Sequence, residues 1–332
     1  MNKKLSIFAI VLIIVGLIGS IWSGFFSMPY FINKLQDFDE KVNEENTIYE
    51  KNIDLDELNI DTKYVNTKII KSSSNKVIVK AKGIYENMDI QVKDNNKILY
   101  VKEVDKNLSM KKIKSIDDFT SKLLENTFSN HTNMIVIYVP NDVNLKVTSE
   151  SGALIVENDI FLDEFSFDTA NGSLSLPSEV KNLQKLNISS QNYVSIQLGE
   201  ILGIKEVNIY CGDVYIDSDK YNLEDIEKYL PNKVTIKSNN LENNTVNIDS
   251  NLPISRNLNI DGYKSEVNLN LPLDRYKFKF NINAYENIDL NEFLQINFNN
   301  EEYNLKEFQK TINKDLKNEY KVNIQAANVY FN

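Results

Sequence analysis

The sequence predicts an all-β fold: a parallel β-solenoid, or a layered stack of β repeats, with a few flanking helices and one N-terminal transmembrane helix. Three observations predict it: a repeat of about 20 residues, alternating apolar and polar residues within each repeat, and an uncharged apolar segment near the N-terminus. At 332 residues the chain is long enough to bury a large core. We expect a cytoplasmic tip and anchor in 1–30, an acidic linker in 31–50, a β region with a helical insertion in 51–140, the β repeats in 141–285, and a helix and strand cap in 286–332.

The N-terminal segment predicts a membrane anchor. Residues 5–26 carry no charge and, as a helix, are long enough to cross the hydrocarbon layer of a bilayer. Lys3 and Lys4 precede the segment and acidic residues follow it, so the positive-inside rule places the N-terminus in the cytoplasm and the main domain outside. A cleavable signal peptide is the alternative, although no A-x-A-like cleavage site follows the segment.

The repeats predict strands that share one apolar core. In the first copy, one set of alternating residues is apolar and the other set is mainly polar, as in half-buried strands. One unit is too small to bury its apolar face, so stacked units would bury it together, with independent hairpins in a sandwich as the alternative. The copies are LKVTSESGALIV from Leu145, FSFDTANGSLSL from Phe165, LNISSQNYVSIQL from Leu186, VNIYCGDVYI from Val207 and LNIDGYKSEVNLNL from Leu258, with weaker copies from Val234 and Phe278.

Glycines recur between the two runs of each copy and predict structural turns. Several follow Asn, Ser or Asp, which suits a corner where the backbone needs a positive φ. The predicted turn residues are Gly152, Gly172, Gly212 and Gly262.

Three segments predict helices beside the strands. NLEDIEKYL from Asn222 and SIDDFTSKLLENTF from Ser115 each begin with a capping residue followed by Asp three residues later. Near the C-terminus an apolar stripe at spacings of three and four predicts a helix that closes the open end of the stack. The stripe comprises Leu305, Phe308, Ile312 and Leu316.

The reactive side chains predict no catalytic, metal or cofactor site. Cys211 is the only cysteine, so no internal disulfide can form, and its alternating position predicts a core residue. His131 is the only histidine, and Arg256 and Arg275 are the only arginines, so a basic substrate clamp is thinly supplied. Carboxylates that could line one side of a stack, as acid/base pairs or calcium ligands, are more simply solvated turn residues. They are Asp163, Glu164, Asp168, Asp213, Asp217 and Asp219.

A family resemblance covers residues from about 53 to 272. Its carriers are LDELNIDTKYVNTKIIKSSSNKVIVKAKG, ILYVKEV, IVIYVPNDVNLKV and the SG and NG turns at Gly152 and Gly172. In these patterns the chain resembles the DUF4097 family of adhesin-like bacterial β-strand repeat domains. The chain departs from the pattern at Tyr193, where a turn glycine is usual, and in the inserted stretch 113–131. The resemblance implies an extracytoplasmic, non-catalytic domain linked to surface adhesion or to cell-envelope stress systems.

These observations lead to three functional hypotheses. The first is a membrane-anchored, non-enzymatic surface protein that binds a cell-wall polymer or an envelope protein, as an adhesin or an envelope-stress accessory. The alternatives are a polysaccharide-active β-helix enzyme and a structural spacer. A net charge of −10 repels phosphates, so nucleic acid is not an expected partner.

Overall fold

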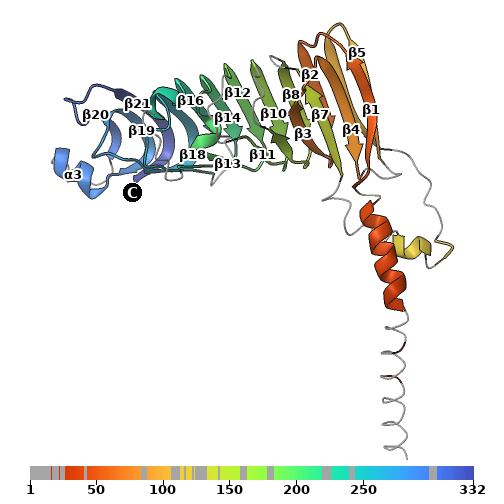
Figure 1. Ribbon diagram of the computed structural model, residues 1–332. Helices are drawn as coiled ribbons and strands as arrows, with labels where there is room; N and C mark the ends of the chain where they lie inside the picture. Colours follow the sequence, from red (N-terminus) through yellow and green to blue (C-terminus); the bar gives the residue numbers. More distant parts are fainter. Residues whose placement is uncertain are drawn as a thin grey trace, which may run out of the picture.

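The computed structural model is an elongated stack of β-strands with few helices, so the prediction of a β-rich fold is confirmed (Figure 1). Its helices are α3 (Glu292–Phe298), the 3-10 helices η1 (Leu198–Ile201) and η2 (Ile226–Tyr229), and helical residues 27–40 and 117–121. The structure describes residues 16, 22, 27–40, 43–83, 88–105, 113–115, 117–121, 123, 133–140, 143–157, 163–177, 183–218, 226–238, 244–298 and 305–332.

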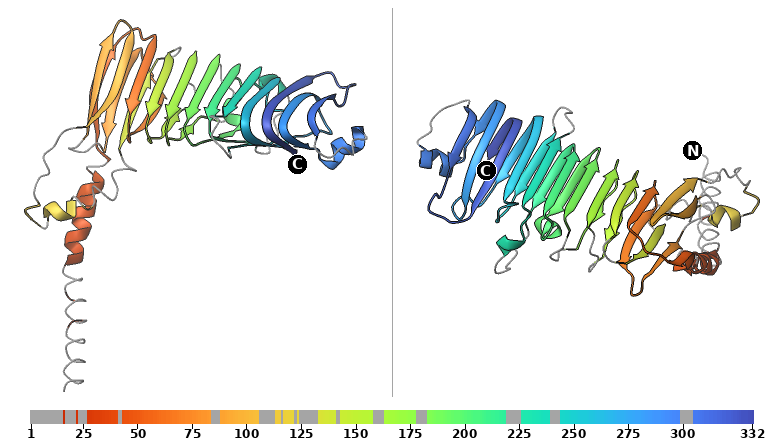
Figure 2. Two further views of the ribbon diagram at one scale, coloured as in Figure 1. Left: turned by 180° about the vertical axis from the view of Figure 1, so that it is seen from behind. Right: turned by 90° about the horizontal axis from the view of Figure 1, so that it is seen from above.

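One long sheet runs the length of the stack. From β6 to β19 its strands are all parallel, and an antiparallel strand closes each end, β5 on β6 and β20 on β19 (Figure 2). In spatial order the strands are β5 (Met88–Asn95), β6 (Ile98–Asp105), β2 (Glu57–Thr62), β8 (Asn144–Ser149), β10 (Glu164–Thr169), β12 (Lys185–Ser190), β14 (Glu206–Cys211), β16 (Lys233–Ser238), β18 (Asn257–Asn270), β21 (Glu319–Phe331), β19 (Lys277–Asp289) and β20 (Leu305–Thr311).

A second row of strands lies on the other side of the core, and most of its strands follow a corner after a strand of the long sheet. It comprises two separate series, and the second series joins the long sheet because β18 is long enough to pair with both β16 and β17. The first series is β1 (Glu45–Asn52), β4 (Lys76–Lys82), β7 (Met134–Val139), β3 (Asn66–Lys71), β9 (Leu154–Val156) and β11 (Leu174–Ser175), and the second is β13 (Tyr193–Gln197), β15 (Asp213–Asp217) and β17 (Thr245–Asp249).

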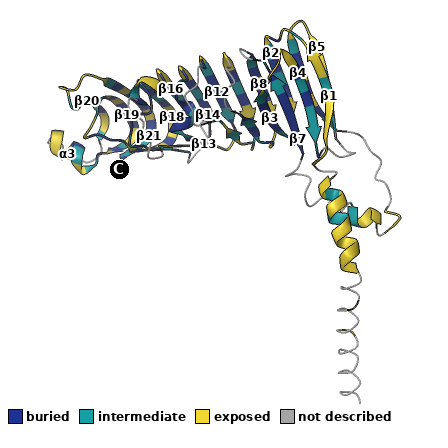
Figure 3. Ribbon diagram, in the orientation of Figure 1, coloured by how far each residue is buried: buried dark blue, intermediate teal, exposed yellow. Residues whose placement is uncertain are grey.

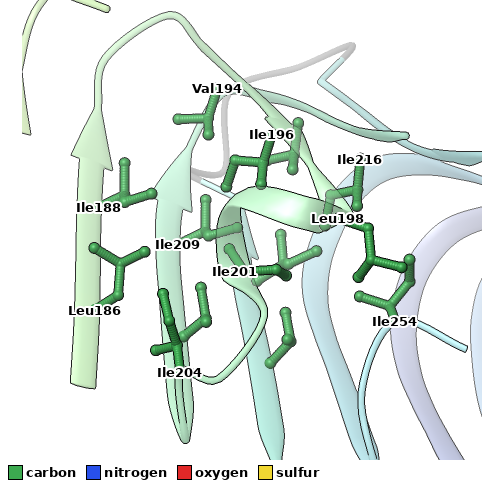
Figure 4. Close-up of a cluster of buried hydrophobic side chains, with 14 of the residues drawn as sticks. Leu186, Ile188, Val194, Ile196, Leu198, Ile201, Ile204, Ile209, Ile216 and Ile254 are labelled. Carbon is green, nitrogen blue, oxygen red and sulfur yellow. The ribbon is translucent and has the colours of Figure 1, made fainter. Parts of the chain in front are cut away.

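The core lies between the two rows. The pairing register aligns Leu145 with Phe165, Leu186 and Val207, and all four side chains are buried. Equivalent positions therefore stack directly on one another, and each repeat buries its apolar face against the next. Figures 3 and 4 show this buried interior and one cluster within it. The alternation expected for the first copy is confirmed, since Val147, Leu154 and Val156 are also buried whereas Lys146 and Thr148 are exposed.

Small residues occupy the inner side of the corner between the rows. Their short side chains leave room for the turning backbone and bond to it: Ser149 Oγ donates to the carbonyl of Gly152 over 3.1 Å, and the amide of Gly172 donates to Thr169 Oγ1 over 2.6 Å. The corner line consists of Thr62, Ser149, Thr169, Ser190, Cys211 and Ser238, all buried.

The four turn glycines lie at these corners, but the expected reason for them is wrong. Among the described glycines, positive φ occurs at Gly83 and Gly203, at +66° and +80°, and not at the four predicted positions. A Cβ on Gly152 would instead lie 2.3 Å from the carbonyl oxygen of Val65, and one on Gly172 would lie 2.5 Å from that of Gly152. Gly212 and Gly262 are similarly crowded, by the Asn192 carbonyl at 2.5 Å and the Ser265 Cβ at 2.9 Å. At Gly152, Gly172 and Gly212 the adjacent repeat approaches too closely for a side chain, and at Gly262 the crowding atoms belong to Ser265 of the same strand.

The predicted C-terminal helix is wrong. Residues 305–311 form β20, antiparallel to β19, and helix α3 lies earlier in the chain. Phe308 is buried against the rings of Phe280 and Phe331, and its neighbours in β20 are exposed or half-buried. A strand at this edge closes the stack because it pairs with β19, which a helix could not do.

The remaining helix and linker predictions have mixed outcomes. The predicted helix from Ser115 is confirmed for its described residues, and Asp118 N donates to Ser115 Oγ over 3.0 Å as its cap. Residues 222–225 of the helix predicted from Asn222 lie outside the described residues, and Ile226–Tyr229 form the 3-10 helix η2. Residues 31–50, expected to be a linker, contain helical residues up to 40 and most of β1, which pairs with β4.

The predicted transmembrane segment lies outside the described residues, except for Gly16 and Trp22, which are helical. Within the part of the chain that the structure describes, no helix is both long and apolar enough to span a bilayer.

Candidate functional site

The solvent face of the long sheet carries a line of hydrogen-bonded polar side chains. Asn208 Nδ2 donates to Asn187 Oδ1 over 3.0 Å, and Asn187 Nδ2 donates to Ser166 Oγ over 3.1 Å. Further along the stack Asn323 Nδ2 donates to Asn259 Oδ1 over 2.9 Å. These residues are paired in register on neighbouring strands, and the hydrogen bonds preorganise two stretches, Ser166 to Asn208 and Asn259 to Asn323, while the Thr235 hydroxyl between them has no hydrogen-bond partner in the described part of the chain. We call this row, Ser166, Asn187, Asn208, Thr235, Asn259 and Asn323, the amide line.

A shallow depression of about 380 Å³ lies over the first four residues of the amide line, Ser166 to Thr235. It spans four strands, β10 to β16, and Tyr210 of β14 stands in it with 52% of its surface exposed. Tyr210 is paired in register with Ser189 on one side and Lys237 on the other, and Asp168 is paired with Ser189. The depression therefore presents an aromatic ring beside one cation, one anion, two amides and three hydroxyls, which are groups that can hydrogen-bond a polar ligand and pack on its apolar face.

Ion pairs lie on the same solvent face of the long sheet, towards its N-terminal end. Lys185 Nζ lies 3.2 Å from Glu164 Oε1, and Lys146 Nζ lies 3.1 Å from Glu57 Oε1. Lys102 Nζ lies 2.6 Å from Asp61 Oδ2. Since most of these side chains are well exposed, each pair contributes little to stability and leaves the face polar with mixed charge.

The carboxylates considered as candidates in the sequence do not converge. Asp163, Glu164 and Asp168 are exposed at β10, and Asp213 accepts a hydrogen bond from the Thr245 amide over 2.8 Å at a corner. Asp217 is exposed at the end of β15. Among the described residues, no group of three or more His, Cys, Asp or Glu is placed to hold a metal ion. Asp219 and His131 lie outside the described residues.

Cys211 is a core residue of the corner line, as expected from its alternating position. Its surface is fully buried, and its Sγ donates to the Asp213 carbonyl over 3.2 Å. Burial raises the pKa of the thiol from 9.0 to about 11, with only partial compensation from hydrogen bonding with Ser190. At neutral pH the group is a neutral thiol and a poor nucleophile.

Tyr210 was not among the candidate residues. The sequence carries a usable signal, because in VNIYC the alternation that buries Val207 and Ile209 places Tyr210 on the solvent face.

Comparisons with known proteins return two solved structures of low similarity. A Bacteroides fragilis NCTC 9343 protein named "putative adhesin" aligns over 88% of this chain and 99% of its own, with 12% identity and a TM-score of 0.40. A Clostridium sporogenes ATCC 15579 protein named "putative cell adhesion protein" aligns over 87% and 99%, with 14% identity and a TM-score of 0.21. No family model and no curated protein matches the chain. The DUF4097 resemblance therefore stays a prediction from sequence patterns.

Proposed function

We propose that this protein is a non-enzymatic binding scaffold, a β-solenoid anchored in a membrane by residues 5–26 and exposed outside the cytoplasm. Its amide line and the depression around Tyr210 bind a neutral saccharide polymer of the cell envelope. The observation that carries the proposal is the exposed Tyr210 ring set among amides that already hydrogen-bond one another.

The chemistry of the depression favours a sugar. A tyrosine ring packs on the apolar face of a sugar ring, while amide, hydroxyl and charged groups beside it hydrogen-bond the hydroxyl groups of the sugar. The side chains along Asn187 and Asn208 are ordered before any ligand arrives, so little conformational entropy is lost on binding. The net charge of −10 disfavours strongly anionic polymers, which leaves a neutral or weakly charged chain as the preferred ligand.

Co-sedimentation tests the proposal. The full chain, purified in detergent, is mixed with peptidoglycan that has been stripped of teichoic acid, and bound protein is measured against polymer concentration. We expect saturable binding that Tyr210→Ala weakens about tenfold or more. Tyr215→Ala is the matched control, because Tyr215 is also an exposed tyrosine, 44% accessible, but lies on β15 of the other row.

The outcomes separate the three hypotheses. Equal binding by both variants would remove the depression from the proposal, and no binding to any envelope polymer would favour the spacer. Release of reducing ends from the polymer, lost on Asp168→Asn, would favour the enzyme.

A further inference from the structure

The second row of strands is interrupted between β11 and β13. The long-sheet strands of the same two repeats, β10 and β12, pair directly, yet β11 ends one series and β13 begins the other. Among the residues that the structure describes, each therefore presents an unpaired strand edge to the gap. Free edges of this kind pair with other extended chains unless something covers them.

The direction of the backbone groups in β13 follows from its hydrogen bonds. The Asp213 amide of β15 donates to the Asn192 carbonyl, so residues of the same parity as Asn192 face β15. Tyr193, Ser195 and Gln197 then face the gap. Gln197 N donates to Glu200 Oε2 over 2.8 Å within the capping box of η1, and Leu176 N, from the β11 side of the gap, donates to Glu200 Oε1 over 3.4 Å. Glu200 thus bridges one end of the gap, and Tyr193 and Ser195 lie beyond the bridge.

A cavity of about 180 Å³ opens behind the gap. Its walls are mainly apolar and include Phe167, Leu174, Ile188, Val194 and Ile196. Figure 4 shows Ile188, Val194 and Ile196 as part of one buried cluster. An apolar space of this size is larger than the ~150 Å³ cavities known to accept a benzene-sized group. The cavity therefore has room for large aliphatic side chains.

The strands on the β13 side of the gap show which residues an added strand would need at its inward positions. Their first inward position holds valine in β13, β15, β17 and β18, and their second holds Ile196, Ile216, Ile248 and Leu269. An added parallel strand in the same register would therefore carry Val-x-Ile or Val-x-Leu. The residue after this pattern aligns with Gln197, next to the Glu200 carboxylate. Glu200 has no ion-pair partner in the described part of the chain, so a lysine at that position is complementary in charge.

We infer that the gap between β11 and β13 is a docking site for an extended peptide of a partner protein with the pattern Val-x-Ile-Lys. The peptide pairs with the free edge of β13, continues the strand interface that β13 already makes with β15, and places its apolar side chains in the cavity. Backbone pairing supplies the affinity and the cavity supplies the selectivity. This site is distinct from the depression around Tyr210, so the two proposals fail independently.

Fluorescence anisotropy tests the inference with a labelled peptide, Lys-Val-Thr-Ile-Lys-Ser, which has the sequence of β16. The full chain in detergent should bind it saturably. Ser195→Pro removes an amide that faces the gap and spares the bonds to β15, so binding should weaken about tenfold, whereas Ser195→Ala should bind normally. Leu174→Trp fills the cavity and should have the same effect as Ser195→Pro.

Modified peptides keep the test decisive if either variant is unstable. Methylation of the peptide amides that would pair with β13 should abolish binding, and exchange of the second lysine for glutamate should weaken it. Equal binding of the methylated peptide, or no saturable binding at all, would overturn the inference. Two further outcomes would overturn the inference. The full chain could form dimers that Ser195→Pro dissociates, or a small apolar dye could bind the protein without being displaced by the peptide.

Discussion

The Oε2 atom of Glu103 lies 3.2 Å from the amide nitrogen of Val65, although 38 residues separate the two in the chain. The same oxygen accepts from the amides of Lys63 and Tyr64, at 2.6 and 3.1 Å. In later repeats the corner amides donate to carbonyls of the preceding corner, as Ser151 does to Lys63 over 2.7 Å. The corner at residues 63–65 receives the carboxylate of Glu103 from β6 instead, so one buried side chain takes the place of a preceding repeat.

Replacement of Glu103 should therefore be costly. Glu103→Leu leaves three amides at the corner without an acceptor and should lower the free energy of unfolding by roughly 3 kcal/mol or more. Glu103→Gln keeps one acceptor oxygen and should cost less. Urea denaturation of the full chain measures both, with the exposed corner residue Glu150→Gln as the control. A loss for Glu103→Leu no greater than for the control would refute this role.

Crowding at the corners predicts that even alanine is too large at Gly172. Gly172→Ala places a methyl group 2.5 Å from the Gly152 carbonyl and should destabilise the fold by about 2 kcal/mol. Gly203→Asn tests the other explanation, because Asn tolerates the positive φ of +80° found there, and it should be nearly neutral. The prediction fails if thermal melting shows Gly172→Ala to be as stable as the parent protein.

The buried thiol of Cys211 predicts a loss of stability in alkali. Its pKa is about 11 in the folded chain against 9.0 for an unperturbed thiol, so the unfolded chain releases this proton first as pH rises. The contribution to stability is complete below pH 9 and is lost between about pH 9 and 11. Cys211→Ala should flatten this part of the stability profile. Iodoacetamide should modify the native protein slowly at pH 8 and the urea-unfolded protein rapidly, and rapid modification of the native state would contradict the burial.

The phenol of Tyr320 ties β21 to η2. Tyr320 OH donates to Glu227 Oε2 over 2.6 Å, and both burial and this carboxylate raise the pKa of the tyrosine. Tyr320→Phe should cost about 1 to 2 kcal/mol and Glu227→Gln somewhat less, since the amide oxygen can still accept. A double-mutant cycle measured by denaturation should show coupling between the two positions. Additive losses would show that the bond contributes nothing measurable.

The topology is tested on intact protoplasts. The proposed anchor and the charges around it predict that the protein stays in the membrane fraction, with residues beyond about 40 open to external protease. Protection of those residues would reverse the orientation. Release of a shortened protein into the medium would favour a cleaved signal peptide.

The sequence predicted the repeats well because each is encoded locally. Alternation within ten or twelve residues identifies the inward positions, and the register of β8 to β14 follows the copies read from Leu145 to Val207. Glu103 could have been noticed, since it shares the inward parity of Leu99 and Val101 in ILYVKEV and breaks their apolar pattern. Its three amide partners are set by contacts distant in sequence, which alternation does not encode.

The ends of the stack could not be predicted in the same way. Leu305, Phe308 and Ile312 have helical spacing, and only pairing with β19 makes the segment a strand. Local propensity is overruled there by a free sheet edge. The gap between β11 and β13 is likewise invisible in sequence, because Leu174 and Val194 occupy ordinary inward positions and the failure to pair is a property of two adjacent repeats.

The spatial order β18, β21, β19 also constrains how the chain is made. Residues 319–331 lie between two strands that precede them in sequence, and they pair in parallel with both. While the protein is being synthesised, repeats up to β18 can assemble one after another, but β19 has no parallel neighbour until β21 has emerged. The hairpin of β19 and β20 must therefore wait, paired only with itself, with the ring faces of Phe278 and Phe280 uncovered. A nascent chain that has emerged as far as β20 but not β21 would therefore expose this hairpin to aggregation.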